Sequence, residues 1–145
     1  MDAKYNTIIG KLAVPLTHPA REVETSLGDL VADAFAERAD CDVALVGSGS
    51  IRSKVIGPTV TLKDLLGCFP FDDFVSKYVI NGEQMRTAFS HFMRPENRNG
   101  EGECFQVNGR VKAVYDDRQQ RLVSLKIDGA EMPPDRLYSV CLQGY

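Results

Sequence analysis

A run of four apolar residues at positions 43–46 ends directly in the glycine- and serine-rich segment 47–50. The run is continuous rather than periodic, which is typical of a strand that is buried on both faces. Two glycines immediately after such a strand indicate a tight loop, because glycine adopts backbone conformations that other residues avoid. The sequence therefore predicts a central buried strand that ends in a compact loop and is followed by Arg52.

Three helices are expected around this strand. Residues 26–38 place apolar side chains at helical spacing, with Ser26 as the predicted N-cap and Asp29 at the capping-box position. A second, short helix is expected at about residues 61–67, where a threonine is followed three positions later by an aspartate. A third follows the pair at 81–82 and carries one apolar face.

Strands are expected before and after these helices. Their apolar patterning places them at 7–16, 74–80, 105–107, 111–115, 122–127 and 137–142. Turn pairs such as Asn108-Gly109 separate the late strands, which indicates a series of hairpins, and the polar residues 94–103 predict an exposed loop. Because helices cluster early and strands late, the predicted fold class is α+β rather than a regular βαβ repeat.

The composition fits one domain, because 145 residues of which 43% are hydrophobic can bury a sizeable core. A formal net charge of -3 from well-mixed charges gives no basic surface for a nucleic-acid polymer. No apolar stretch approaches the roughly 20 residues that cross a bilayer, so membrane insertion is not expected. A small molecule or a protein is the expected partner. The last predicted strand runs almost into Tyr145, so the chain is expected to stop inside a larger protein.

Two arginines are candidates for binding an anion. Arg52 follows the glycine loop, where backbone amides can approach a ligand and a guanidinium can bind phosphate or carboxylate. Arg21 precedes the first predicted helix, whose N-terminus favours anions. A plain turn with a surface arginine is the alternative for the loop, and Arg21 taken alone is more typical of a solvated residue. The loop matches neither a Walker motif nor a nucleophile elbow, so Ser48 and Ser50 are poor nucleophile candidates.

Two aromatic residues are candidates for stacking on a planar ligand. Phe71 follows a proline that can present its ring outward, and Tyr145 follows a glycine at the end of the chain. Core packing is the alternative, and from the residues alone it is favoured for Phe69 and, more weakly, for Phe71.

Hydrolytic machinery is not indicated. The two histidines, His18 and His91, belong to no zinc-binding pattern, and we expect the first in a turn and the second on a solvated helix face. The four cysteines at positions 41, 68, 104 and 141 form no C-x-x-C pair and are expected to be buried free thiols. Free thiols weakly favour a reducing compartment.

Four motifs resemble, in order and spacing, the C-terminal domain of 5'-nucleotidases and related enzymes such as UDP-sugar hydrolases and cyclic-nucleotide phosphodiesterases. They are 24–34 (ETSLGDLVADA), 42–52 (DVALVGSGSIR), 69–73 (FPFDD) and 105–109 (FQVNG). The resemblance implies an α+β domain of mixed sheets flanked by helices, layered α/β/β/α, that binds a nucleotide. It also implies a separate N-terminal metallophosphoesterase domain that holds two divalent metal ions and attacks the phosphate. Residues 1–145 are then one substrate-binding domain of a hydrolase, truncated at its C-terminal end and inactive alone.

The resemblance assigns roles to four residues. Arg21 and Arg52 match family arginines that contact the ribose or phosphate region of the substrate. Phe71 matches one of two aromatic residues that sandwich the base, and Tyr145 falls where the family places the second. No catalytic residue and no metal ligand is expected in this chain.

Three departures from the family pattern bear on the ligand. Gly47 stands where many members have an asparagine that hydrogen-bonds the ligand, so this contact is either missing or supplied by Ser48. The pair 144–145 replaces the usual Asn-Phe, and the chain ends before the Gly-Gly-Asp-Gly segment that commonly follows. Gly47 and Ser48 complete the set of predicted substrate-binding residues.

The leading hypothesis is a nucleotide-recognition domain of a metal-dependent phosphoesterase. One alternative is a non-catalytic interaction domain that kept the fold, and another is the same enzyme class acting on sugar nucleotides, cyclic nucleotides or another ester. The family is often periplasmic or at the cell surface, whereas the expected free thiols favour the cytoplasm, so the compartment stays open.

Overall fold

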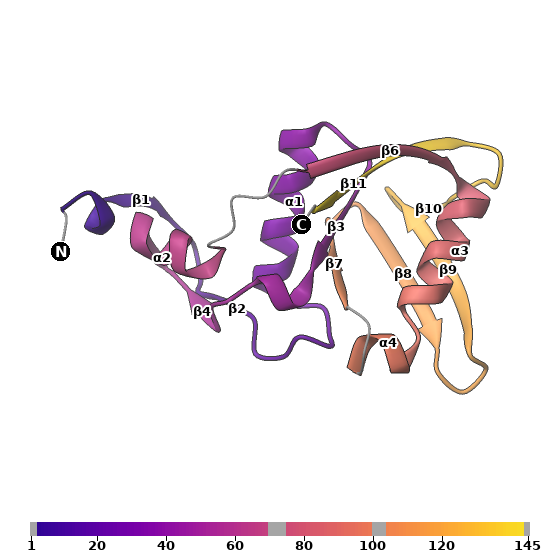
Figure 1. Ribbon diagram of the computed structural model, residues 1–145, viewed down its shortest axis with the longest axis horizontal. Coiled ribbons are helices and arrows are strands. Elements are labelled where there is room, and N and C mark those ends of the chain that lie inside the picture. Colours follow the sequence, from indigo (N-terminus) through magenta and orange to yellow (C-terminus); the bar gives the residue numbers. More distant parts are fainter. Residues whose placement is uncertain (1–2, 70–74, 100–103, 144–145) are drawn as a thin grey trace.

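A mixed sheet lies at the centre of the computed structural model, which describes residues 3–69, 75–99 and 104–143 (Figure 1). The strand order is β6-β11-β3-β7. Its strands are β3 (Val43–Gly47), β6 (Val75–Asn81), β7 (Phe105–Val107) and β11 (Leu137–Gln143). β3 and β11 are parallel, and the other neighbours are antiparallel. Together with the helices, this mixed architecture confirms the predicted α+β class.

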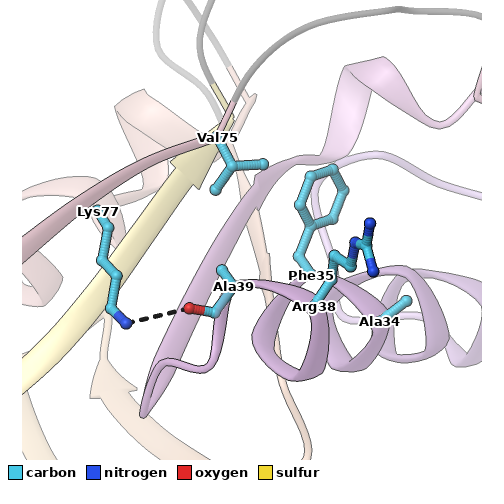
Figure 2. A pocket seen from close by; sticks show the side chains of 6 residues that line it. All are labelled: Ala34, Phe35, Arg38, Ala39, Val75 and Lys77. Carbon is cyan, nitrogen blue, oxygen red and sulfur yellow. Dashed lines mark hydrogen bonds between the residues drawn. The ribbon is translucent and has the colours of Figure 1, made fainter.

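The predicted buried strand is β3, and all five of its residues are buried. One face of the sheet is covered by α1 (Ser26–Ala39), which packs over Ala44. Phe35 of α1 and Val75 of β6 lie on this side of the sheet (Figure 2). The side chains on β3 are apolar towards both faces, which is why the run in the sequence is continuous rather than alternating.

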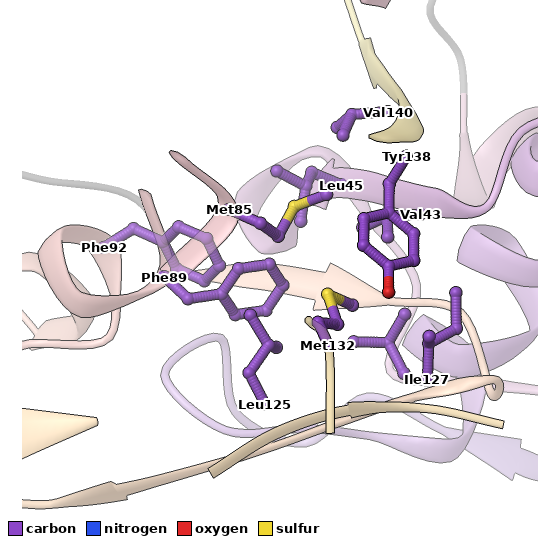
Figure 3. Close-up of a cluster of buried hydrophobic side chains, with 11 residues drawn as sticks. Val43, Leu45, Met85, Phe89, Phe92, Leu125, Ile127, Met132, Tyr138 and Val140 are labelled. Carbon is purple, nitrogen blue, oxygen red and sulfur yellow. The ribbon is translucent and has the colours of Figure 1, made fainter. Parts of the chain in front are cut away.

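The opposite face of the central sheet packs against α3 (Gly82–Phe92) and a second, antiparallel sheet. That sheet has the order β10-β9-β8 and contains β8 (Val111–Asp116), β9 (Arg121–Ile127) and β10 (Ala130–Glu131). Figure 3 shows the resulting core, in which Met85 and Phe89 of α3 lie near Leu45 and Leu125. Each fully buried side chain of this size stabilises the fold by roughly 1.5–3 kcal/mol.

Residues 3–17 and 55–68 form a smaller lobe, at the left of Figure 1. It contains η1 (Ala3–Asn6), β1 (Ile8–Lys11), β2 (Leu16–Thr17), β4 (Val55–Ile56), β5 (Thr59–Thr61) and α2 (Leu62–Cys68). The single strand predicted at 7–16 is therefore wrong in part, since β1 pairs with β5 and β2 pairs with β4. The break includes Pro15, which has no N–H to donate to a sheet.

The predicted start of the first helix is shifted by one residue. The N-cap of α1 is Thr25, whose Oγ1 accepts from the Gly28 N–H at 3.0 Å, and Ser26 is the first helical residue. Asp29 is therefore not the capping-box partner of the N-cap. The capping box predicted at Thr61 is present in α2.

Two further predictions about the second half of the chain are wrong. The turn at Asn108 closes no hairpin, because β7 pairs with β3 whereas β8 pairs with β9. The Asn108 side chain is buried instead, and it joins the main chain of Asp42 and Ala44 through two hydrogen bonds of 2.9 Å each. Part of the predicted 94–103 loop is helix α4 (Pro95–Asn99), where a proline in the first turn favours helix initiation.

Candidate anion-binding site

A cavity of about 230 Å³ opens where the loop after β3 meets the segment after β2. Its lining residues are His18, Arg21, Ser48, Gly49, Ile51, Arg52, Ser53 and Lys54. The pairing of β2 with β4 brings the two segments together, and the His18 N–H continues it by donating to the Lys54 carbonyl at 2.8 Å. Chain segments about 30 positions apart thus form one wall.

The cavity is cationic. Arg21, Arg52 and Lys54 all line it, and none of the described residues in its lining is acidic. The Lys54 Nζ also donates to the Pro19 carbonyl at 3.2 Å, which holds the ammonium beside Arg21's segment. Three cationic side chains on the wall of one cavity favour a bound anion such as phosphate.

Main-chain hydrogen bonds fix the loop that carries Arg52. The Ser48 N–H donates to the Cys104 carbonyl at 2.8 Å, at the residue that precedes β7. The Arg52 N–H donates to the Cys68 carbonyl at 2.7 Å, at the end of α2. Within the loop, residues 48–50 form the short helix η2, which the Ile51 N–H closes by donating to the Ser48 carbonyl at 3.3 Å. The position of Arg52 is therefore set by elements on both sides of the loop.

A buried polar network lies behind the cavity. The imidazole of His18, only 5% exposed, lies with Nδ1 2.7 Å from Thr25 Oγ1 and Nε2 3.0 Å from the Ser48 carbonyl oxygen. Gln106, 1% exposed, donates from Nε2 to Ser48 Oγ at 3.0 Å and accepts from the Thr25 N–H at 3.1 Å. The network joins the N-cap of α1, the glycine loop and β7.

These bonds define the tautomer of His18 and the role of Ser48. Because a carbonyl oxygen only accepts, Nε2 carries a proton, and Nδ1 shares a hydrogen bond with the Thr25 hydroxyl. Because Nε2 donates its proton to the Ser48 carbonyl oxygen, it cannot also remove the proton of the Ser48 hydroxyl, even though Ser48 Oγ lies 3.3 Å away. Ser48 is also fully buried, so this pair is structural rather than a nucleophile and its base.

The predicted site residues fall into three groups. Arg21, Arg52 and Ser48 line the cavity, although the hydroxyl of Ser48 points into the network with His18 and Gln106. Gly47 ends β3 opposite Phe105 and is not among the lining residues. Phe71 and Tyr145 lie outside the described residues.

Sequence reasoning missed three residues of this region: His18, Lys54 and Gln106. The prediction that His18 simply sits in a turn is wrong, because the ring is buried and bonded on both sides. The sequence does contain a signal for Gln106. It lies between Phe105 and Val107 in a strand, so its side chain faces the opposite side from these two apolar residues. In β7 that side is the buried one.

A second cavity, of about 530 Å³, lies on the other side of α1. Figure 2 shows its lining of Ala34, Phe35, Arg38, Ala39, Val75 and Lys77. The Lys77 ammonium donates to the carbonyls of Ala39 and Asp40, at 3.1 and 2.8 Å, and so closes the C-terminal end of the helix. Phe35 also packs edge-on against Phe69, with ring centroids 5.6 Å apart.

Asp29 has the most perturbed carboxyl group near the start of α1. Burial raises its pKa from the ordinary 3.8 to about 7, and a hydrogen bond and charge repulsion from Glu24 act in the same direction. Its Oδ1 atom is buried and has no hydrogen-bond partner within the described part of the chain. The folded state therefore favours the protonated form of this carboxyl.

Neither a metal-binding cluster nor a membrane-spanning helix is found among the described residues. Within 3–69, 75–99 and 104–143, no three His, Cys, Asp or Glu side chains come close enough together to hold a metal ion. No helix in these ranges is long and apolar enough to span a bilayer.

Comparison with known proteins gives a match over almost the whole chain. The profile of the family described as 5'-nucleotidase, C-terminal domain, matches residues 8–145. Endonuclease YhcR of Bacillus subtilis (strain 168) is 26% identical over 98% of this chain, and an apyrase of Tabanus yao is 30% identical over 86%. The crystal structure of a 5'-nucleotidase precursor from Thermus thermophilus superposes with a TM-score of 0.78 at 19% identity and covers 97% of the chain.

These proteins are all much longer than this chain. The match takes up 12% of the endonuclease, 25% of the apyrase and 30% of the Thermus protein. The shared part is therefore one region of each, and in the Thermus structure that region has the same fold as this chain.

Proposed function

The chain belongs to the family of 5'-nucleotidase C-terminal domains, and from this premise we propose that it binds the nucleotide substrate of a larger metal-dependent phosphoesterase. The observation that carries the proposal is that Arg21, Arg52 and Lys54 line one cavity, and that no acidic side chain is among the described residues of its lining. The substrate-binding domain is residues 1–145, and the domain that performs the hydrolysis is a separate one.

The cationic cavity takes the phosphate end of the nucleotide. A planar guanidinium donates two parallel hydrogen bonds to phosphate oxygens, and Arg52 is held ready for this by its main-chain bond to Cys68. Arg21 lies on the facing segment of the cavity wall. Each charge-assisted hydrogen bond contributes roughly 1.5–3 kcal/mol, so the loss of one arginine should weaken binding by about 10- to 100-fold.

The base end of the nucleotide is assigned to Phe71 and Tyr145 on the basis of the resemblance to the family, since both residues lie outside the described part of the chain. Stacking of a base on such rings contributes roughly 1–3 kcal/mol.

The chemistry is assigned to two divalent metal ions in an N-terminal domain. The described residues of this chain do not fit such a centre, because they bring no three potential ligands together. The contribution of this chain is to bind and orient the substrate, and the isolated domain should bind nucleotides weakly and hydrolyse none.

The names of the relatives leave the substrate class of the whole protein to experiment. They include an apyrase, several 5'-nucleotidases and an endonuclease. A net charge of -3 supports a small nucleotide over a polynucleotide, since a polymer requires a basic surface. Sugar nucleotides and cyclic nucleotides also carry a base and a phosphate group, so the proposal includes them as substrates.

A substrate panel on the whole protein tests the assignment. Nucleoside monophosphates, a sugar nucleotide, a cyclic nucleotide and a short oligonucleotide are compared by kcat/KM in the wild type, Arg52→Ala and Phe71→Ala. We expect both variants to lose at least about tenfold in kcat/KM on the preferred substrate. Unchanged kinetics in both would instead favour a non-catalytic interaction domain, the alternative to which the glycine at position 47 lends support.

A further inference from the structure

Two buried cysteines face each other although 100 positions separate them. The Sγ atoms of Cys41 and Cys141 lie 2.6 Å apart. Cys41 follows the last turn of α1, Cys141 lies in β11, and both pack with Ala44 beneath the helix. This separation is only about half an ångström longer than a disulfide bond, which is about 2.05 Å.

We propose that Cys41 and Cys141 form an intrachain disulfide when the chain folds in an oxidising compartment. The two thiols give up two protons and two electrons, and one S–S bond forms between them. A low-molecular-weight disulfide of the glutathione class accepts the two protons and the two electrons, and its own S–S bond breaks to give two thiols. This inference is independent of the proposed function, because it rests only on the geometry of the two side chains.

The other two cysteines lie elsewhere in the fold. Cys68, the last residue of α2, packs with Leu27 and Ile56. Cys104 precedes β7 and is bonded through its carbonyl to Ser48, at the opposite end of β3 from Cys41. The fold therefore selects one pairing out of the six that four cysteines allow.

The geometry also determines when the bond forms. Burial raises the pKa of Cys141 to about 12, and the hydrogen bond with Cys41 acts in the same direction. Thiol–disulfide exchange proceeds through the thiolate, so the folded dithiol reacts slowly with a disulfide in solution. The bond forms during folding, while these thiols are still exposed to solvent, and is then protected by α1.

The cross-link would fix the two strands that lead to the proposed nucleotide site. It ties β11 to the turn between α1 and β3, and β3 ends in the loop that carries Arg52. A bond that closes a loop of this length restricts the unfolded chain strongly, which predicts a melting temperature about 10 °C or more above that of the reduced protein.

The chain refolded in a reduced/oxidised glutathione buffer tests this directly. After denaturation and alkylation of remaining thiols, peptide mass mapping should show Cys41 linked to Cys141, with only Cys68 and Cys104 alkylated. Cys41→Ala should remove the difference in melting temperature between refolding with and without oxidised glutathione, whereas Cys104→Ala should keep it. The mapping needs only the wild type, so a variant that folds poorly does not affect it.

Two results would overturn the proposal: four alkylated cysteines after oxidative refolding, and a bridge that includes Cys68 or Cys104. A Cys41–Cys141 bridge that forms equally fast in the folded and the unfolded chain would contradict the protection by α1.

Discussion

The Nε2 atom of His18 lies 3.0 Å from the carbonyl oxygen of Ser48 and so joins the segment after β2 to the glycine loop. The other ring nitrogen of His18, Nδ1, lies 2.7 Å from Thr25 Oγ1. Both His18 and Thr25 are buried. The loop that presents Arg52 is thus positioned from behind by a buried imidazole.

Replacement of His18 by alanine should destabilise the domain by about 2–4 kcal/mol, because it leaves the Thr25 hydroxyl and Ser48 carbonyl unpaired and opens a cavity. Urea unfolding followed by circular dichroism gives the free energy of unfolding. The matched control is His91→Ala, since His91 is exposed on α3 and its removal should change stability by less than about 0.5 kcal/mol. Equal effects of the two variants would show that the His18 network contributes nothing.

Gly28→Ala should destabilise the domain by about 2 kcal/mol or more, because the added Cβ would lie 2.2 Å from Gln106 Oε1 and displace a fully bonded side chain. Gly67→Ala provides the control: it lies in α2, and among the described residues no packing neighbour lies within 4 Å of its added Cβ. Alanine favours the helix there, so we expect this variant to be about 0.5–1 kcal/mol more stable than the wild type. A melting temperature that falls in Gly28→Ala and rises in Gly67→Ala would support the packing of Gln106 against α1. An unchanged melting temperature in Gly28→Ala would refute it.

The fold class, β3 and the three predicted helices could be read from the sequence, because their patterns are local. The apolar run at 43–46 and the capping pair at Thr61 are complete within a few residues. The pairing of strands could not be read in this way. The turn at Asn108 looks like a hairpin turn, yet Asn108 is used by Asp42 and Ala44, which are more than 60 positions away.

The same limit applies to the candidate site. Arg21 and Arg52 were predicted as one site from the resemblance, and the structure places both on the same cavity. His18 gave no such signal, because a histidine before a proline is an ordinary turn and its partners come from α1 and the loop after β3. Lys54 is likewise brought to the cavity only by the pairing of β2 with β4.

Stability should depend on pH through Asp29. Its pKa is about 7 in the folded chain against 3.8 ordinarily, so the folded state binds this proton more tightly than the unfolded state. The resulting stabilisation is fully present below about pH 4 and is lost as the pH rises to about 7. Asn mimics the protonated carboxyl, so Asp29→Asn should be more stable than the wild type at pH 8 and about equal to it at pH 4.

The measurement is the midpoint of urea unfolding at several pH values between 4 and 8. Asp135→Asn is the control, because Asp135 is exposed and its substitution should give the same small difference at every pH. A constant difference between Asp29→Asn and the wild type across this range would show that Asp29 titrates normally.

The account rests on the cationic cavity being the phosphate subsite, and calorimetric titration with a nucleoside 5'-monophosphate and with the matching nucleoside tests this most directly. The wild type should bind the monophosphate at least about tenfold more tightly than the nucleoside, and Arg52→Ala should remove most of that preference. Arg118→Ala, on an exposed turn, should retain it. If wild type and Arg52→Ala discriminate equally between the two ligands, the phosphate is bound elsewhere and the central claim is wrong.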